Sequence, residues 1–246
     1  MPPSSQTPPL ILETEAPNGL SAPAPDDRSS HVHRQLVGAL GAALPLLLWL
    51  VAAFRPVDPA RRWDLLGSVS AYYHTGAVSV FAGILIALTV FLFTYRGYDN
   101  ARGSHDRIAA NIAATAAAFV AFFPTAAPNG VTAPSWWTAT IGTIHSVSAT
   151  TLFAAFIYFS LFLFPLSDAK KGAPLPADKI RRNRIYRVCG VAMVVCVLWA
   201  GSALFTHAPI FWPEALALEF FAVSWLTKGR VVVTAGRAWR AIRGQQ

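Results

Sequence analysis

Charge is scarce in this sequence. Asp, Glu, Lys and Arg make up 13% of the 246 residues, about half of the ~25% that is usual in soluble domains. Acidic residues are the scarcer kind, with 12 against 20 basic ones, and the net charge is +8. This composition argues against a soluble globular domain. The apolar residues are gathered in long runs instead, which is typical of helices that cross a lipid bilayer.

Cysteine and sequence repeats are also lacking. The two cysteines, Cys189 and Cys196, lie in one apolar run. Seven residues of helix would place them about 10 Å apart along the axis, which is too far for a disulfide. We therefore interpret both as small apolar residues, and they indicate no redox compartment. No internal repeat and no heptad pattern is present.

The N-terminal segment lacks the features of a cleavable signal peptide, since it has no basic start followed by an apolar core. It is rich in Pro, Ser, Ala and Asp. Such a composition predicts a disordered tail over residues 1–35. At the other end of the chain, residues 230–246 are expected to form a basic tail.

Between these tails lie six apolar runs. A hydrocarbon core of ~30 Å requires about 20 residues of helix, and the lengths of the runs lie around that value. The runs are Leu36–Phe54, Gly76–Tyr95, Ile108–Ala127, Trp137–Phe164, Val188–Phe205 and Pro213–Leu226. The sequence therefore predicts an all-α fold, a polytopic transmembrane bundle of six helices over residues 36–229.

The basic residues predict the orientation of this bundle. With six spans, 17 of the 20 Lys and Arg fall on one side, together with both termini, and Arg55, Arg61 and Arg62 fall on the other. Cytoplasmic loops carry the excess of basic residues, so we expect both termini to be cytoplasmic. The positive charge then needs no nucleic acid to explain it, and the expected partners are membrane lipids.

A few ionisable residues map to the outer half of the predicted bundle. His74, His145 and His207 are all expected there, as is Glu219 in the sixth run. Ionisable side chains at membrane depth need a partner and commonly mark functional sites. Because His145 and Glu219 are expected at similar depth, we predict a contact between them. Glu214, in the first turn of the sixth helix, suits the positive end of the helix dipole.

Three motifs carry a resemblance to known proteins. They are Ser70-Ala-Tyr-Tyr-His74, the stretch from Asn111 through Phe123-Pro124-Thr125, and His145. With the six-run layout, the sequence resembles uncharacterised bacterial multi-pass proteins that carry a domain of unknown function. Those proteins are distantly similar to eukaryotic Frag/DRAM/Sfk-type proteins. The resemblance implies a bacterial inner-membrane location and supplies no activity.

A second resemblance concerns Ser70-x-x-x-His74, which is similar to a motif of the alkaline ceramidase and adiponectin-receptor superfamily of intramembrane zinc hydrolases. That superfamily also has seven spans and a His-x-x-x-His pair in its last span. The sixth run of this chain contains no histidine.

Four hypotheses for function follow. The first is a non-enzymatic membrane protein whose outer polar cluster binds a lipid headgroup or a partner, or holds the bundle together. The second is a metal-dependent hydrolase of a lipid-like substrate, in which His74, His145 and His207 hold zinc while Ser70, Tyr73 and Glu219 are the catalytic candidates. The third is a proton-coupled transporter using Glu219 and His145, and the fourth a paired-histidine haem protein.

Overall fold

The computed structural model describes residues 25–56, 59–95, 103–166 and 174–230, and within them the fold is all-helical without strands. The predicted all-α fold of six helices is thus confirmed, with one helix for each apolar run. The six helices are α1 (Pro25–Phe54), α2 (Val78–Phe93), α3 (Gly103–Phe122), α4 (Ala139–Tyr158), α5 (Ala177–Thr206) and α6 (Phe211–Lys228). Two short 3₁₀ helices, η1 (Pro59–Arg61) and η2 (Ser70–His74), separate α1 from α2, and the π-helical η3 (Phe159–Leu163) continues α4.

Helix boundaries differ from the predicted runs where polar residues join a helix. Helix α1 begins at Pro25, so residues 25–35 of the predicted tail are helical, consistent with the preference for proline at the first helical position. Helix α5 begins at Ala177 rather than Val188. The remaining tail residues, 1–24 and 231–246, lie outside the described residues.

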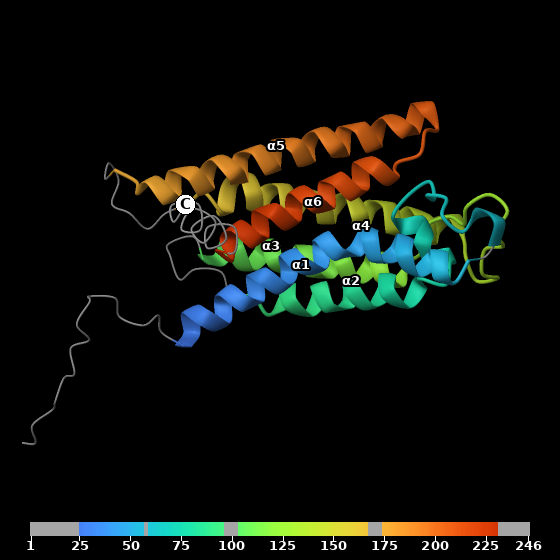
Figure 1. Ribbon diagram of the computed structural model, residues 1–246, viewed down its shortest axis with the longest axis horizontal. Coiled ribbons are helices and arrows are strands. Elements are labelled where there is room, and N and C mark those ends of the chain that lie inside the picture. The colour runs from blue at the N-terminus through green and yellow to red at the C-terminus, as the bar shows by residue number, and fades with distance from the viewer. Residues whose placement is uncertain (1–24, 57–58, 96–102, 167–173, 231–246) are drawn as a thin grey trace, which may run out of the picture.

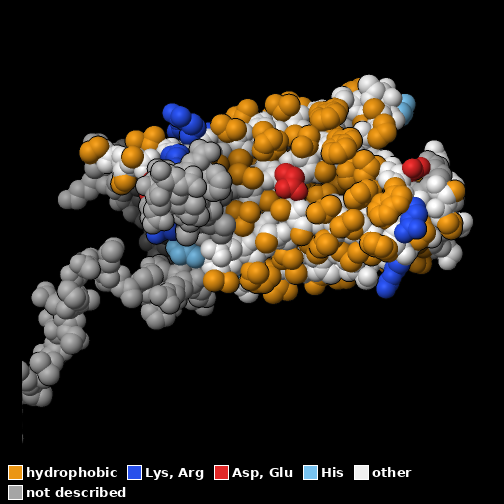
Figure 2. Space-filling model, in the orientation of Figure 1, with side chains coloured by type: hydrophobic (Ala, Val, Ile, Leu, Met, Phe, Trp, Pro, Cys, Tyr) orange, Lys and Arg blue, Asp and Glu red, His pale blue; other side chains and the backbone are white. Residues whose placement is uncertain are grey.

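Three of these helices carry stretches long and apolar enough to cross a membrane, namely His31–Phe54, Ala139–Leu163 and Ala177–Thr206, and α2 is a shorter apolar helix. Their outward faces are apolar as well: on α5, Leu204 is 80% and Phe205 is 87% exposed. Figure 2 shows apolar side chains covering the middle of the molecule, with the basic ones toward its two ends. Exposed apolar surface of this extent marks a membrane or partner interface.

The helices form a ring in which each packs against its neighbours. Helix α1 contacts α2 and α6, α3 lies between α2 and α4, and α5 lies between α4 and α6. Helix α3 approaches its neighbours closely because its inward positions are alanine, of which Ala110, Ala113, Ala114 and Ala117 are fully buried. An aromatic core closes the ring elsewhere, with the rings of Phe156 and Phe221 stacked 3.7 Å apart.

The two ends of the bundle differ in character (Figure 1). We call the end with η1, η2 and residues 123–138 the η2 end, and the opposite end, where α1 begins and α6 finishes, the Lys228 end. At the Lys228 end, Gln35 Nε2 donates to Gly229 O at 2.9 Å. Lys179 Nζ donates to Phe164 O at 3.1 Å and to Leu166 O at 2.7 Å, which satisfies carbonyls at the end of the α4–η3 helix.

Candidate functional site

In the hydroxyl-rich segment 67–75, which precedes α2, the side chains form hydrogen bonds with nearby backbone groups. Ser68 Oγ accepts from Ala71 N at 3.0 Å, at the start of η2. At its end, Thr75 Oγ1 donates to Tyr72 O at 2.7 Å and accepts from Ala77 N at 3.1 Å. Local hydrogen bonds of this kind, from side chain to backbone, stabilise turns in preference to a regular helix. They explain the density of hydroxyls, and they hold η2 as a compact buried insertion between α1 and α2.

Glu214 joins this insertion to α6. Its Oε2 accepts from Val69 N, the residue before η2, at 2.7 Å. Close by, Gly67 O accepts from Ile210 N at 2.6 Å and from Phe211 N at 3.0 Å. The carboxylate therefore stands in the first turn of α6, as expected, and also bonds the backbone at the start of η2. These contacts fix η2 against the first turn of α6.

Two histidines and a tryptophan form hydrogen bonds with the backbone at the end of α3. His145 Nδ1 donates to Phe123 O at 2.6 Å, Trp137 Nε1 donates to Pro124 O at 3.1 Å, and His74 Nε2 donates to Thr125 O at 2.9 Å. These three carbonyls belong to the segment that directly follows α3, where Pro124 prevents the helix from continuing. The three ring N–H groups therefore supply hydrogen-bond donors to the non-helical backbone just after α3.

The structure does not bring the three predicted zinc ligands together. His145 is buried, and its ring and the ring of His74 bond backbone carbonyls on either side of Pro124. His207 is exposed at the end of α5, in the left-handed conformation with φ 54°. The described part of the chain holds no group of three or more His, Cys, Asp or Glu that could bind a metal ion. The zinc site thus remains a sequence-based prediction that this geometry does not support.

The catalytic candidates of the hydrolase hypothesis are also dispersed. Ser70 is buried beside a small internal cavity that Glu214 also lines. Tyr73 is half-buried, with its ring 5.4 Å from that of His74 and 6.0 Å from that of Phe81. Glu219 lies on the exposed side of α6, in a different cavity.

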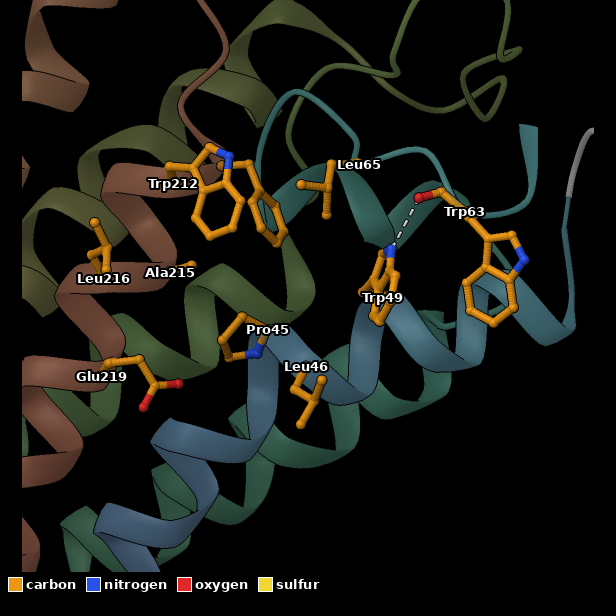
Figure 3. Close-up of a pocket in the computed structure, with 10 residues that line it drawn as sticks. Pro45, Leu46, Trp49, Trp63, Leu65, Trp212, Ala215, Leu216 and Glu219 are labelled. Carbon is orange, nitrogen blue, oxygen red and sulfur yellow. Dashed lines mark hydrogen bonds between the residues drawn. The ribbon is translucent and has the colours of Figure 1, made fainter.

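The predicted contact between His145 and Glu219 does not form. His145 points from α4 to the end of α3, where Phe123 O is its partner. Glu219 instead faces α1 across a surface groove (Figure 3). Similar depth in two helices was the basis of the prediction, but their rotation turns the two side chains to different sides of the bundle.

A polar cavity of about 510 Å³ opens at the η2 end. Its polar lining residues are Arg62, Asp64, Tyr72, Thr75 and Asn129. Leu66 N donates to the hydroxyl of Tyr72 at 3.4 Å, and burial raises the pKa of that hydroxyl. The guanidinium of Arg62 lies 5.2 Å from the ring centre of Trp63, in cation–π range.

Sequence reasoning missed Arg62, Asp64 and Asn129 as candidate site residues. The available signal was that Arg62 is one of only three basic residues on its predicted side of the membrane. Asn129 precedes Gly130, whose φ of 81° suits glycine and turns the chain toward the cavity.

An apolar groove of about 420 Å³ lies between α1 and α6, beside this cavity. Its lining includes Trp49, Trp63, Leu65, Phe211, Trp212 and Glu219 (Figure 3). Trp49 Nε1 donates to Trp63 O at 3.1 Å, which holds the segment after η1 against α1. Leu65 lines both the groove and the polar cavity, so the two adjoin.

No protein-family model, curated protein or solved structure matches this chain. The arrangement at the η2 end offers a polar cavity with a positioned cation, next to an apolar groove. This combination suits the binding of an amphipathic molecule better than it suits hydrolysis by grouped metal ligands.

Proposed function

We propose that this chain is a six-span protein of the bacterial inner membrane, with both termini cytoplasmic, that binds the headgroup of a phospholipid-like ligand in the polar cavity. The six helices, the exposed apolar surface and the basic residues concentrated at one side support this topology. In this orientation the η2 end and its cavity face outward.

The observation that carries the proposal is the junction of the polar cavity with the apolar groove at Leu65. A phospholipid needs a polar site for its headgroup beside apolar surface for its acyl chains. The volume of about 510 Å³ lies within the ~300–1,000 Å³ of small-molecule pockets.

Arg62 gives the cavity a preference for phosphate. A guanidinium offers several N–H donors in a plane and binds phosphate oxygens through paired hydrogen bonds. This guanidinium lines the cavity and lies 5.2 Å from the ring centre of Trp63. Asp64 and Asn129 supply acceptors for hydroxyl or amino groups elsewhere in the headgroup.

Lipid retention tests the proposal. We expect wild-type protein purified in mild detergent to retain added phosphatidylglycerol, measured by native mass spectrometry. Arg62→Ala should retain several-fold less, because the cavity loses its phosphate-binding cation. The control is Arg181→Ala, which removes the same charge from an exposed position near the start of α5. Equal retention by wild type and Arg62→Ala would refute the proposal.

A further inference from the structure

Glu219 is a carboxylate on an apolar surface. It lies about 12 Å along the axis of α6 from Phe211, at 1.5 Å per residue, and its side chain is exposed. Figure 2 shows acidic side-chain atoms in the middle of the apolar face over α6. Within the part of the chain that the structure describes, no hydrogen bond or ion pair reaches this carboxylate.

Such a position is costly for an unpartnered charge. Hydrocarbon does not solvate a carboxylate, so ionisable groups at membrane depth usually face a polar ligand or an opposite charge. Glu214, on the same helix, illustrates the alternative, because its carboxylate bonds Val69 N. Glu219 has no such structural role to account for it.

The groove around Glu219 is built from aromatic and aliphatic side chains. Figure 3 shows its carboxylate extending from α6 toward α1, with Trp212, Trp49 and Trp63 farther along toward the η2 end. Tryptophan is the best aromatic partner for a cation. Glu219 is the only charged residue among those that line the groove. The groove therefore combines one negative charge with a largely apolar, aromatic wall.

We propose that this groove binds a lipophilic organic cation, with the ammonium or phosphonium centre paired to Glu219 and the apolar body packed along the tryptophans. The volume of about 420 Å³ suits a small molecule rather than a whole helix. Charge complementarity selects a cation over a neutral or anionic lipid. The same groove offers apolar surface to the acyl chains of the proposed phospholipid, but the polar anchor of the cation is Glu219 in the groove and not Arg62 in the cavity, so this proposal does not rest on phosphate binding.

Binding of tritiated tetraphenylphosphonium tests this site. We expect purified wild-type protein in detergent to bind the probe saturably, and Glu219→Gln to weaken binding by roughly tenfold or more. Asp178→Asn, which removes a carboxylate from the first turn of α5, should bind as wild type. Absent saturable binding by wild type, or equal affinity of Glu219→Gln, would overturn the proposal.

A second measurement uses the unmodified protein, in case Glu219→Gln does not fold. The apolar reagent dicyclohexylcarbodiimide labels carboxyl groups in apolar surroundings, and peptide mass spectrometry locates the label. We expect labelling of Glu219, and protection by tetraphenylphosphonium in proportion to its occupancy. Labelling unaffected by saturating tetraphenylphosphonium would overturn the proposal. Arg62→Ala should leave the protection intact, so failure of the phospholipid proposal is distinguishable from failure of this one.

Discussion

At the scale of single residues, most polar side chains of the η2 end have a structural partner. The ring N–H groups of His74, Trp137 and His145 bond the backbone carbonyls of Phe123–Thr125, and Glu214 bonds Val69 N. Such bonds contribute little net energy when made, but a buried group left without its partner is costly. His74, His145 and the segment Phe123–Thr125 therefore have roles in holding the fold.

Glu214 and Glu219 should differ sharply in their effect on stability. Glu214→Leu leaves Val69 N without its acceptor, and we expect a loss of about 1–3 kcal/mol, seen as a lower melting temperature in detergent. Glu219→Gln is the matched control, since its side chain is exposed and without a partner among the described residues. It should melt as wild type. A lower melting temperature for Glu219→Gln alone would contradict this assignment of roles.

At the scale of elements, η2 and its flanking turn are held closely against the end of α1. A Cβ added at Gly76 would lie 2.8 Å from the backbone oxygen of Arg55, which cannot move aside as a flexible side chain would. Gly83, in the middle of α2, has open space around its Cα instead. Packing therefore requires glycine at position 76, whereas it does not require glycine at position 83.

Alanine substitutions should separate these two positions. Gly76→Ala forces the turn away from α1, and we expect a cost of about 1–3 kcal/mol from overpacking. Gly83→Ala introduces no contact and favours the helix by roughly 0.5–1 kcal/mol. Thermal melting of the two variants in detergent provides the comparison. If Gly76→Ala melts at or above wild type, the close contact with Arg55 does not constrain the turn.

At the scale of the whole molecule, the apolar exterior and the placement of charge agree on a membrane protein. Three helices are long and apolar enough to cross a membrane, and α2 is a shorter apolar helix. The remaining two, α3 and α6, complete the ring by packing against their neighbours. Their polar residues, such as Asn111 and Glu219, lower their apolar character. The proposed six-span topology therefore depends most on these two helices.

A reporter fusion measures the topology directly. An enzyme that is active only outside the cytoplasm should remain inactive when fused after Gln246, because the proposed orientation places the C-terminus inside. The same reporter inserted after Gly130, at the η2 end, should be active. Activity after Gln246 together with silence after Gly130 would reverse the orientation and place the polar cavity on the cytoplasmic side.

The sequence by itself determined the helices and the residue chemistry. Hydropathy depends on about 20 neighbouring residues at a time, so the six apolar runs each gave a helix. The helix ends differed where polar turns joined a helix and where Pro124 ended α3 at Phe122, before the predicted Ala127. Ser70 through His74 stood out by composition, and Glu219 stood out as a carboxylate in an apolar run. These features are local along the chain.

Only the tertiary structure decided which side chains meet. His145 faces Phe123 O rather than Glu219, and His207 lies apart from the other two outer histidines. The polar cavity joins residues from the end of α1, the segment through η2 and the connection to α4. Such contacts between side chains depend on the order and rotation of the helices around the ring. These are set by packing between distant faces, here by the alanines of α3 and the aromatic core, which no local pattern in the sequence specifies.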